Sequence, residues 1–169
     1  MARGSLIREG RAWVMGDDVD TDQILPARHM PLTDPRETGR HLFEEVMPRF
    51  AREVVAGDLI VAGRNFGLGS TRGQSLIALR VLGIGGILAV SFARTFLRGS
   101  IGEGIPVLEC PGLPGGIVPL SWLRVDFGGG VVEDVKSGMR LSGVPLPGFL
   151  LDRVVAGGSI GYLQRLRTD

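Results

Sequence analysis

Residues 58–90 constrain the fold most, because they predict a strand, a glycine-rich turn, a helix and a second strand in succession. The run 58–62 is apolar after its first residue, and residues 63–69 hold three glycines. Residues 70–82 have the spacing of a helix, which Gly83 ends, with apolar candidates Leu76, Ile77, Leu79 and Val81. Such a unit packs a helix against two parallel strands. The sequence therefore predicts an α/β fold with a parallel βαβ core.

The flanking segments complete this fold. Before the unit, the pattern predicts a strand at 11–15, a helix from Pro35 to the residue before Pro48 with Leu42, Phe43 and Val46 on its apolar side, and a helical turn at 49–54. Thr33 or Asp34 would cap the long helix. After the unit, it predicts a helix at 92–102, strands at 105–109, 123–127, 131–135 and 139–141, and helices at 149–155 and 160–166. With no repeat or domain-sized linker, we expect residues 1–169 to form one domain.

Composition and charge exclude several classes of protein. The 27 glycines in 169 residues follow no G-X-Y period, which excludes collagen. Nineteen Lys and Arg against eighteen Asp and Glu give a net charge of +1, too little for a basic nucleic-acid surface. The most apolar run, 81–93, is shorter than the ~20 residues that a membrane helix needs, and residues 1–16 lack a signal peptide's apolar region. We expect a cytoplasmic protein that binds neither nucleic acid nor membrane.

The residues that usually bind metals are few. Cys110 is the single cysteine, which excludes an internal disulfide and a cluster held by several thiolates of this chain. His29 and His41 are the only histidines, and no paired ligand spacing accompanies them. The sequence therefore predicts no metal site.

Residues 63–72 gather a glycine turn, two hydroxyls and two arginines where the helix of the βαβ unit begins. The spacing fits neither a P-loop, nor a dinucleotide fingerprint, nor a serine-hydrolase elbow. One interpretation is purely structural, with Ser70 or Thr71 capping the helix. The other is an anion site, because a helix N-terminus offers free N–H groups. Arg72 favours the second, since the helix dipole disfavours a cation there unless an anion is bound.

Three ordered blocks of the chain carry a recognisable pattern, at residues 16–26, residues 63–72, and residues 91–98 followed by 104–107. Together they resemble the isopropylmalate dehydratase small subunits, a family built on the aconitase-type swivelling domain. The second reads G-R-N-F-G-L-G-S-T-R, which is similar to the family signature G-x-N-x-G-x-G-S-S-R. The resemblance spans most of residues 10–110 and implies a swivelling β/β/α domain. The C-terminal hairpin and helix match the family in length more than in amino-acid sequence.

The resemblance also implies an activity. The chain would be the small subunit of a hydro-lyase that interconverts 2-isopropylmalate and 3-isopropylmalate, by dehydration and rehydration, in leucine biosynthesis. In this family a separate large subunit holds a four-iron–four-sulfur cluster on three cysteines. We therefore expect no cofactor on this chain, a large cluster-bearing partner, a small hydroxy-dicarboxylate substrate, and no activity without the partner. The isolated chain could also form a homo-oligomer.

The resemblance assigns roles by motif match. Ser70 would be the base that removes the carbon-bound proton, and Asp22 would support it. Arg72 would clamp a substrate carboxylate, with the hydroxyl of Thr71 beside it. The loop at about 27–33, which contains Arg28 and His29, matches the region that selects the substrate side chain.

The chain departs from the family directly after Arg72, where Gly73-Gln74-Ser75 replaces Glu, then His, Ser or Tyr, then a small residue. Because of this departure, the sequence does not determine which hydroxy acid is the substrate. The alternatives are the small subunit of homoaconitase or of 2,3-dimethylmalate dehydratase, and a non-catalytic anion-binding or assembly module on the same fold.

Overall fold

The computed structural model of the chain describes residues 6–70, 73–113 and 115–167. Its described strands form one sheet in the order β4-β3-β2-β1-β5-β6-β7. They are β1 (Ile7–Val14), β2 (Leu59–Ala62), β3 (Gly86–Ala89), β4 (Val107–Glu109), β5 (Trp122–Asp126), β6 (Val131–Asp134) and β7 (Arg140–Ser142). Strands β1 to β4 are parallel, whereas β5 joins β1 antiparallel and continues into the hairpin with β6 and β7. The mixed α/β fold is as predicted.

The sheet curls until its two edges meet. The Val144 amide, just beyond β7, donates to the Glu109 carbonyl at the end of β4, at 2.7 Å. Gly143 permits this approach, because a side chain there would collide with Leu108. Neither edge of the sheet is left as a long unpaired strand.

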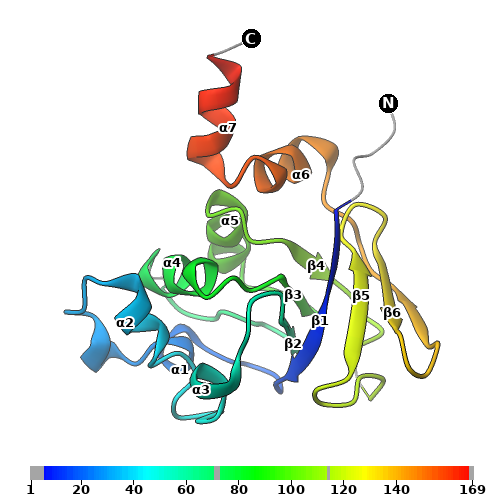
Figure 1. Cartoon of the computed structure of the whole chain (residues 1–169), viewed down its shortest axis with the longest axis horizontal. Helices are drawn as coiled ribbons and strands as arrows, with labels where there is room; N and C mark the ends of the chain where they lie inside the picture. The colour runs from blue at the N-terminus through cyan, green and yellow to red at the C-terminus, as the bar shows by residue number, and fades with distance from the viewer. Residues whose placement is uncertain (1–5, 71–72, 114, 168–169) are drawn as a thin grey trace.

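The helices lie on the side of the parallel strands, with the last two packed on a neighbouring helix instead of on the sheet (Figure 1). They are α1 (Thr21–Ile24), the 3₁₀ helix η1 (Ala27–His29), α2 (Pro35–Gly39), α3 (Phe50–Glu53), α4 (Gly73–Val81), α5 (Arg94–Gly102), α6 (Gly148–Val155) and α7 (Ser159–Leu166). Figure 1 shows α4 and α5 beside β2 to β4, and the β5–β6 hairpin on the other side of β1. No described helix is both long and apolar enough to cross a membrane.

The predicted βαβ unit is confirmed. Strands β2 and β3 are fully buried and pair in parallel, and α4 between them buries Leu76 and Leu79. Val81 is 42% exposed, so the prediction that it belongs to the apolar set is wrong. At about 100° per residue, Val81 lies about 140° around the helix from Leu76, away from the buried face.

The segment after Pro35 corrects another prediction. Asp34 caps α2 as expected, accepting a hydrogen bond from the Arg36 amide at 2.9 Å, but the helix ends at Gly39 instead of continuing to Pro48. Residues 40–46 are turns, and Phe43 has a positive φ of 56°. The Phe43 amide donates to the Ile24 carbonyl at 3.0 Å and its ring is fully buried, so a tertiary contact replaces the local helix. Val46 is accordingly exposed.

Candidate functional site

Two of the three sequence blocks lie against each other at the carboxyl ends of β1 and β2. The Asp18 amide donates to the Arg64 carbonyl at 2.8 Å, and the Thr21 amide donates to the Leu68 carbonyl at 2.8 Å. A short parallel bridge joins Asp20 to Leu68. The segment after β1 therefore runs along the glycine turn after β2 and is held to it by main-chain hydrogen bonds.

The third block joins this edge through Ser91, which follows β3. Its hydroxyl accepts a hydrogen bond from the Asn65 amide at 2.9 Å, and its carbonyl accepts one from the Phe66 amide at 3.0 Å. Gly67 then packs against the ring of Phe96 in α5, where any side chain would collide with that ring. Three segments far apart in the sequence thus form one edge, the place where open parallel sheets bind ligands.

Asp22 reaches this edge because α1 begins beside the glycine turn. The Asp20 carboxylate accepts from the Gln23 amide at 2.8 Å, and the Gln23 side chain accepts from the Asp20 amide at 3.0 Å. This capping box fixes the start of the short helix. Asp22 is exposed in its first turn. The sequence pattern did not predict α1 or η1.

Ser70 is exposed and directly follows Gly69, the last glycine of the turn. A Cβ atom on Gly69 would lie 3.0 Å from the Thr21 hydroxyl, so this end of the turn lies close to the start of α1. Thr71 and Arg72 lie outside the described residues. Their roles, and the role of Ser70 as base, stay predictions.

Gln74 is a site residue for which the sequence pattern indicated no role. Its side-chain nitrogen donates to the carbonyls of Met30 at 2.9 Å and of Leu32 at 3.0 Å. Four residues after Ser70, the first turn of α4 is therefore attached to the loop at 27–33. The departure from the family sequence directly after Arg72 was the one indication that Gln74 is unusual. Sequence spacing alone could not reveal which groups its side chain contacts.

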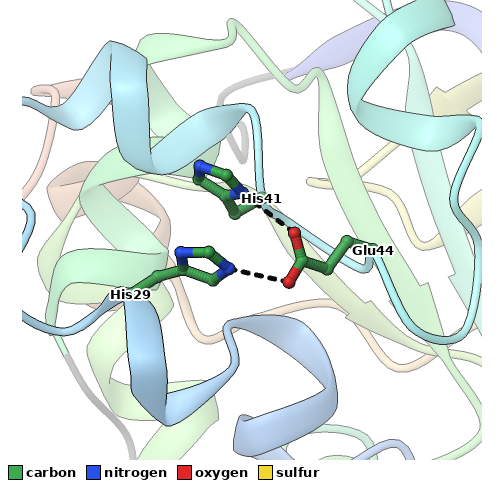
Figure 2. Close-up of side chains that lie close together, drawn as sticks. All are labelled: His29, His41 and Glu44. Atoms are coloured by element: carbon green, nitrogen blue, oxygen red, sulfur yellow. Dashed lines mark hydrogen bonds and ion pairs between the residues drawn. The ribbon is translucent and has the colours of Figure 1, made fainter.

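His29 lies in a cluster that sequence reasoning also missed (Figure 2). Its Nε2 lies 2.7 Å from Glu44 Oε1, and His41 Nδ1 lies 2.9 Å from Glu44 Oε2. The two imidazole rings stack with their centroids 3.7 Å apart. Burial alone raises the pKa of Glu44, but the hydrogen bonds from His41 and His29 outweigh it and lower the pKa to about 2. Glu44 is therefore a carboxylate at neutral pH.

Arg28 is held by acidic neighbours. Its guanidinium donates to Glu45 Oε1 at 2.7 Å and also to Glu44 Oε1. The hydrogen bond to Glu45, with the charge of Glu44, raises the pKa of Arg28. The one described cation of the loop at 27–33 is thus paired within this chain.

Ser70 and Asp22 do not line the cavity that opens at this edge of the sheet. A cavity of about 200 Å³ opens at the carboxyl ends of the strands, lined by residues 14–17, 61–63, Val90, Leu113, Gly115 and Ile117. Neither Ser70 nor His29 contributes to its lining. Because Ser70 is solvent-exposed, another surface would have to cover it to exclude water.

Cys110 does not fit a cluster site. Its side chain is fully buried at the end of β4, and burial raises the pKa of its thiol. A cluster ligand must be a thiolate, and several thiolates are needed. This single protonated thiol is a core residue.

Comparisons with known proteins agree along nearly the whole chain. Residues 33–112 match the aconitase C-terminal domain. The chain is 42% identical to 3-isopropylmalate dehydratase small subunit 1 of Methanopyrus kandleri, covering 92% of each chain. It is 44% identical to the 3-isopropylmalate dehydratase small subunit of Pyrobaculum calidifontis, covering 94% of this chain and 98% of the relative. It is 40% identical to the 2,3-dimethylmalate dehydratase small subunit of Eubacterium barkeri, covering 96% of each.

A solved structure supports the same relationship. The crystal structure of a 3-isopropylmalate dehydratase from Methanocaldococcus jannaschii superposes with a TM-score of 0.90 and is 33% identical, covering 96% of each chain.

Proposed function

Because the chain belongs to the aconitase-related family of dehydratase small subunits, we propose that it is the small subunit of a hydro-lyase that interconverts 2-isopropylmalate and 3-isopropylmalate. The reaction removes water from one hydroxy acid and adds it back at the neighbouring carbon. Its place would be leucine biosynthesis, and its cytoplasmic location stays a prediction.

The observation that carries this proposal is the convergence of the three blocks at one edge of the sheet. The segments 16–26, 63–70 and 91–98 are joined there by main-chain hydrogen bonds and leave Ser70 exposed after the glycine turn. A non-catalytic module would not need the serine and arginine of the signature together. Their retention favours the enzyme.

In the proposed mechanism, Ser70 removes the carbon-bound proton, and Arg72 with Thr71 holds a substrate carboxylate through paired hydrogen bonds. Asp22, in the first turn of α1, supports these groups. An alcohol titrates several units above pH 7, and each unit is ~1.4 kcal/mol. A helix N-terminus contributes at most ~2 kcal/mol, so this chain alone cannot make Ser70 a useful base.

The missing stabilisation would come from the large subunit. Closing a second surface over Ser70 would exclude water, and the positive charge of Arg72 would then stabilise the deprotonated serine more strongly than it does in solvent. We place the four-iron–four-sulfur cluster on that subunit, because Cys110 is a single, buried and protonated thiol. This chain would supply the proton transfer and the carboxylate contact.

The pairing of Arg28 bears on the choice of substrate. Its guanidinium is already neutralised by Glu44 and Glu45, so the loop offers no free described cation to a third substrate carboxylate. This favours an alkyl-substituted malate over the tricarboxylic substrate of a homoaconitase. Isopropylmalate and 2,3-dimethylmalate both meet that requirement, and the similarity to several isopropylmalate dehydratase small subunits favours isopropylmalate.

The proposal is tested by co-expressing the chain with a large subunit from the same organism and measuring anaerobic turnover. We expect a stable complex that converts 3-isopropylmalate with a higher kcat/KM than 2,3-dimethylmalate or homoaconitate. A preference for 2,3-dimethylmalate would identify the alternative substrate. A complex that converts none of the three acids would support a non-catalytic module.

A further inference from the structure

His29, His41 and Glu44 bring three metal-binding groups together from two separate segments. His29 closes the 3₁₀ helix η1, whereas His41 and Glu44 belong to the turns after α2. One ligand atom from each residue can be chosen so that all three lie within 4.8 Å of one another. Figure 2 shows both imidazoles pointing toward the same carboxylate.

The donor set suits a zinc-like cation. Two imidazole nitrogens and one carboxylate oxygen are typical ligands of Zn²⁺, with bonds of about 2.0–2.2 Å and a fourth position open to water. Tetrahedral bonds of that length separate neighbouring ligand atoms by roughly 3.3 Å. The Glu44 oxygens now lie 2.7 and 2.9 Å from His29 Nε2 and His41 Nδ1. Binding one ion would lengthen both contacts, and the stacked rings, now 15° from parallel, would have to splay so that both nitrogens face the same point.

The surroundings permit both entry and charge balance. The side chains of His29, His41 and Glu44 are 17, 32 and 24% exposed, so an ion can reach them from solvent. Arg28 competes for Glu44, but it also donates to Glu45 at 2.7 Å. It can keep Glu45 while Glu44 turns to a cation.

We propose that His29, His41 and Glu44 bind one divalent d-block cation of the zinc class. Both imidazoles would bind as neutral tautomers that carry their proton on the ring nitrogen facing away from Glu44. Three metal bonds would then replace the two hydrogen bonds and fasten the loop at 27–33 to the turns that follow α2. The inference rests on this geometry and not on the proposed function, because it concerns the chain without its large subunit.

The test is Co²⁺ and Zn²⁺ binding to the full chain, purified alone and free of any affinity tag. His29 and His41 are the only histidines of the sequence, and Cys110 is buried, so imidazole ligation can come from this cluster alone. We expect one Co²⁺ per chain with the intense visible bands of tetrahedral coordination, displaced by equimolar Zn²⁺. Bound Zn²⁺ should also raise the melting temperature.

Variants assign the ligands. H29Q, H41Q and E44Q should each weaken Zn²⁺ binding by at least about tenfold, while E37Q, which removes an exposed carboxylate of α2, should leave it unchanged. R28Q should tighten binding, because it removes the competing cation. Thermal melts of the metal-free variants check folding, and the two histidines provide independent tests on separate segments. Only weak octahedral Co²⁺ bands, or affinity unchanged in both H29Q and H41Q, would overturn the proposal.

Discussion

The side-chain amide of Gln74 donates to the main-chain carbonyl of Met30 at 2.9 Å, which attaches the helix after the glycine turn to the loop at 27–33. The same nitrogen donates to the Leu32 carbonyl at 3.0 Å. A residue two positions from Arg72 therefore holds the loop proposed to contact the substrate side chain. We interpret Gln74 as a positioning residue.

Replacing Gln74 with methionine, which has the same length and no donor, should lower the free energy of unfolding by about 1–3 kcal/mol, because two carbonyls lose their partner. Urea denaturation of the isolated chain measures this loss. In the complex, KM should rise more than kcat falls, since a displaced loop weakens substrate binding in general. Q74E adds a carboxylate facing two carbonyls and should be less stable still. A Q74M chain as stable as the parent would refute the positioning role.

The buried carboxylate of Asp58 should make the free energy of unfolding depend on pH in the acidic range. It accepts hydrogen bonds from Arg11 Nη2 at 2.7 Å and Trp13 Nε1 at 2.9 Å. Burial raises the pKa of Asp58, but these bonds outweigh it, and the pKa in the folded state is lowered. The stabilisation is therefore complete above the unfolded pKa of about 3.9 and is lost as pH falls through the lower folded value.

Urea titrations at several pH values check this prediction. D58N should be less stable than the parent by about 2–4 kcal/mol at pH 7, and the difference should shrink below about pH 4. Glu9 provides the control, because it pairs with Arg124 at the surface at 3.4 Å. E9Q should change stability by less than about 1 kcal/mol. A D58N penalty that stays constant down to pH 2 would contradict the account.

Arg72 is predicted to grip a carboxylate with two parallel hydrogen bonds, which a lysine cannot reproduce. In the complex, R72K should raise the KM for 3-isopropylmalate about tenfold or more, equivalent to ~1.4 kcal/mol. R140K, on the exposed strand β7, is the matched control and should behave as the parent. Unchanged KM and kcat in R72K would argue against the clamp.

The parts of the fold that sequence predicts well are those with local causes. The βαβ unit follows from two apolar runs, a glycine turn and the helix stop at Gly83, which has a φ of +76°. The parts it missed depend on distant partners. Strand β1 begins at Ile7, not near residue 11, because its first half pairs with β5 more than 100 residues later. The helix expected to reach the residue before Pro48 ends early because the Phe43 amide donates a hydrogen bond to the Ile24 carbonyl of α1.

The candidate site divides in the same way. The signature motif identifies Ser70 from the amino-acid sequence alone. The position of Ser70 at the carboxyl edge of the sheet follows from the parallel arrangement of the strands. The contacts of Glu44 with His29 and His41 could not be read from spacing, since 15 and 3 residues separate the partners and irregular turns bring them together.

The most direct test of the central claim is the turnover of 3-isopropylmalate by the complex containing S70A. We predict that the complex assembles normally and that kcat falls by at least about 100-fold, as expected when a proton-transfer group is lost. S137A, which removes an exposed hydroxyl from the β6–β7 turn, should retain full activity. An S70A complex with the parent's kcat, or dehydration of 3-isopropylmalate by this chain without its large subunit, would contradict the account.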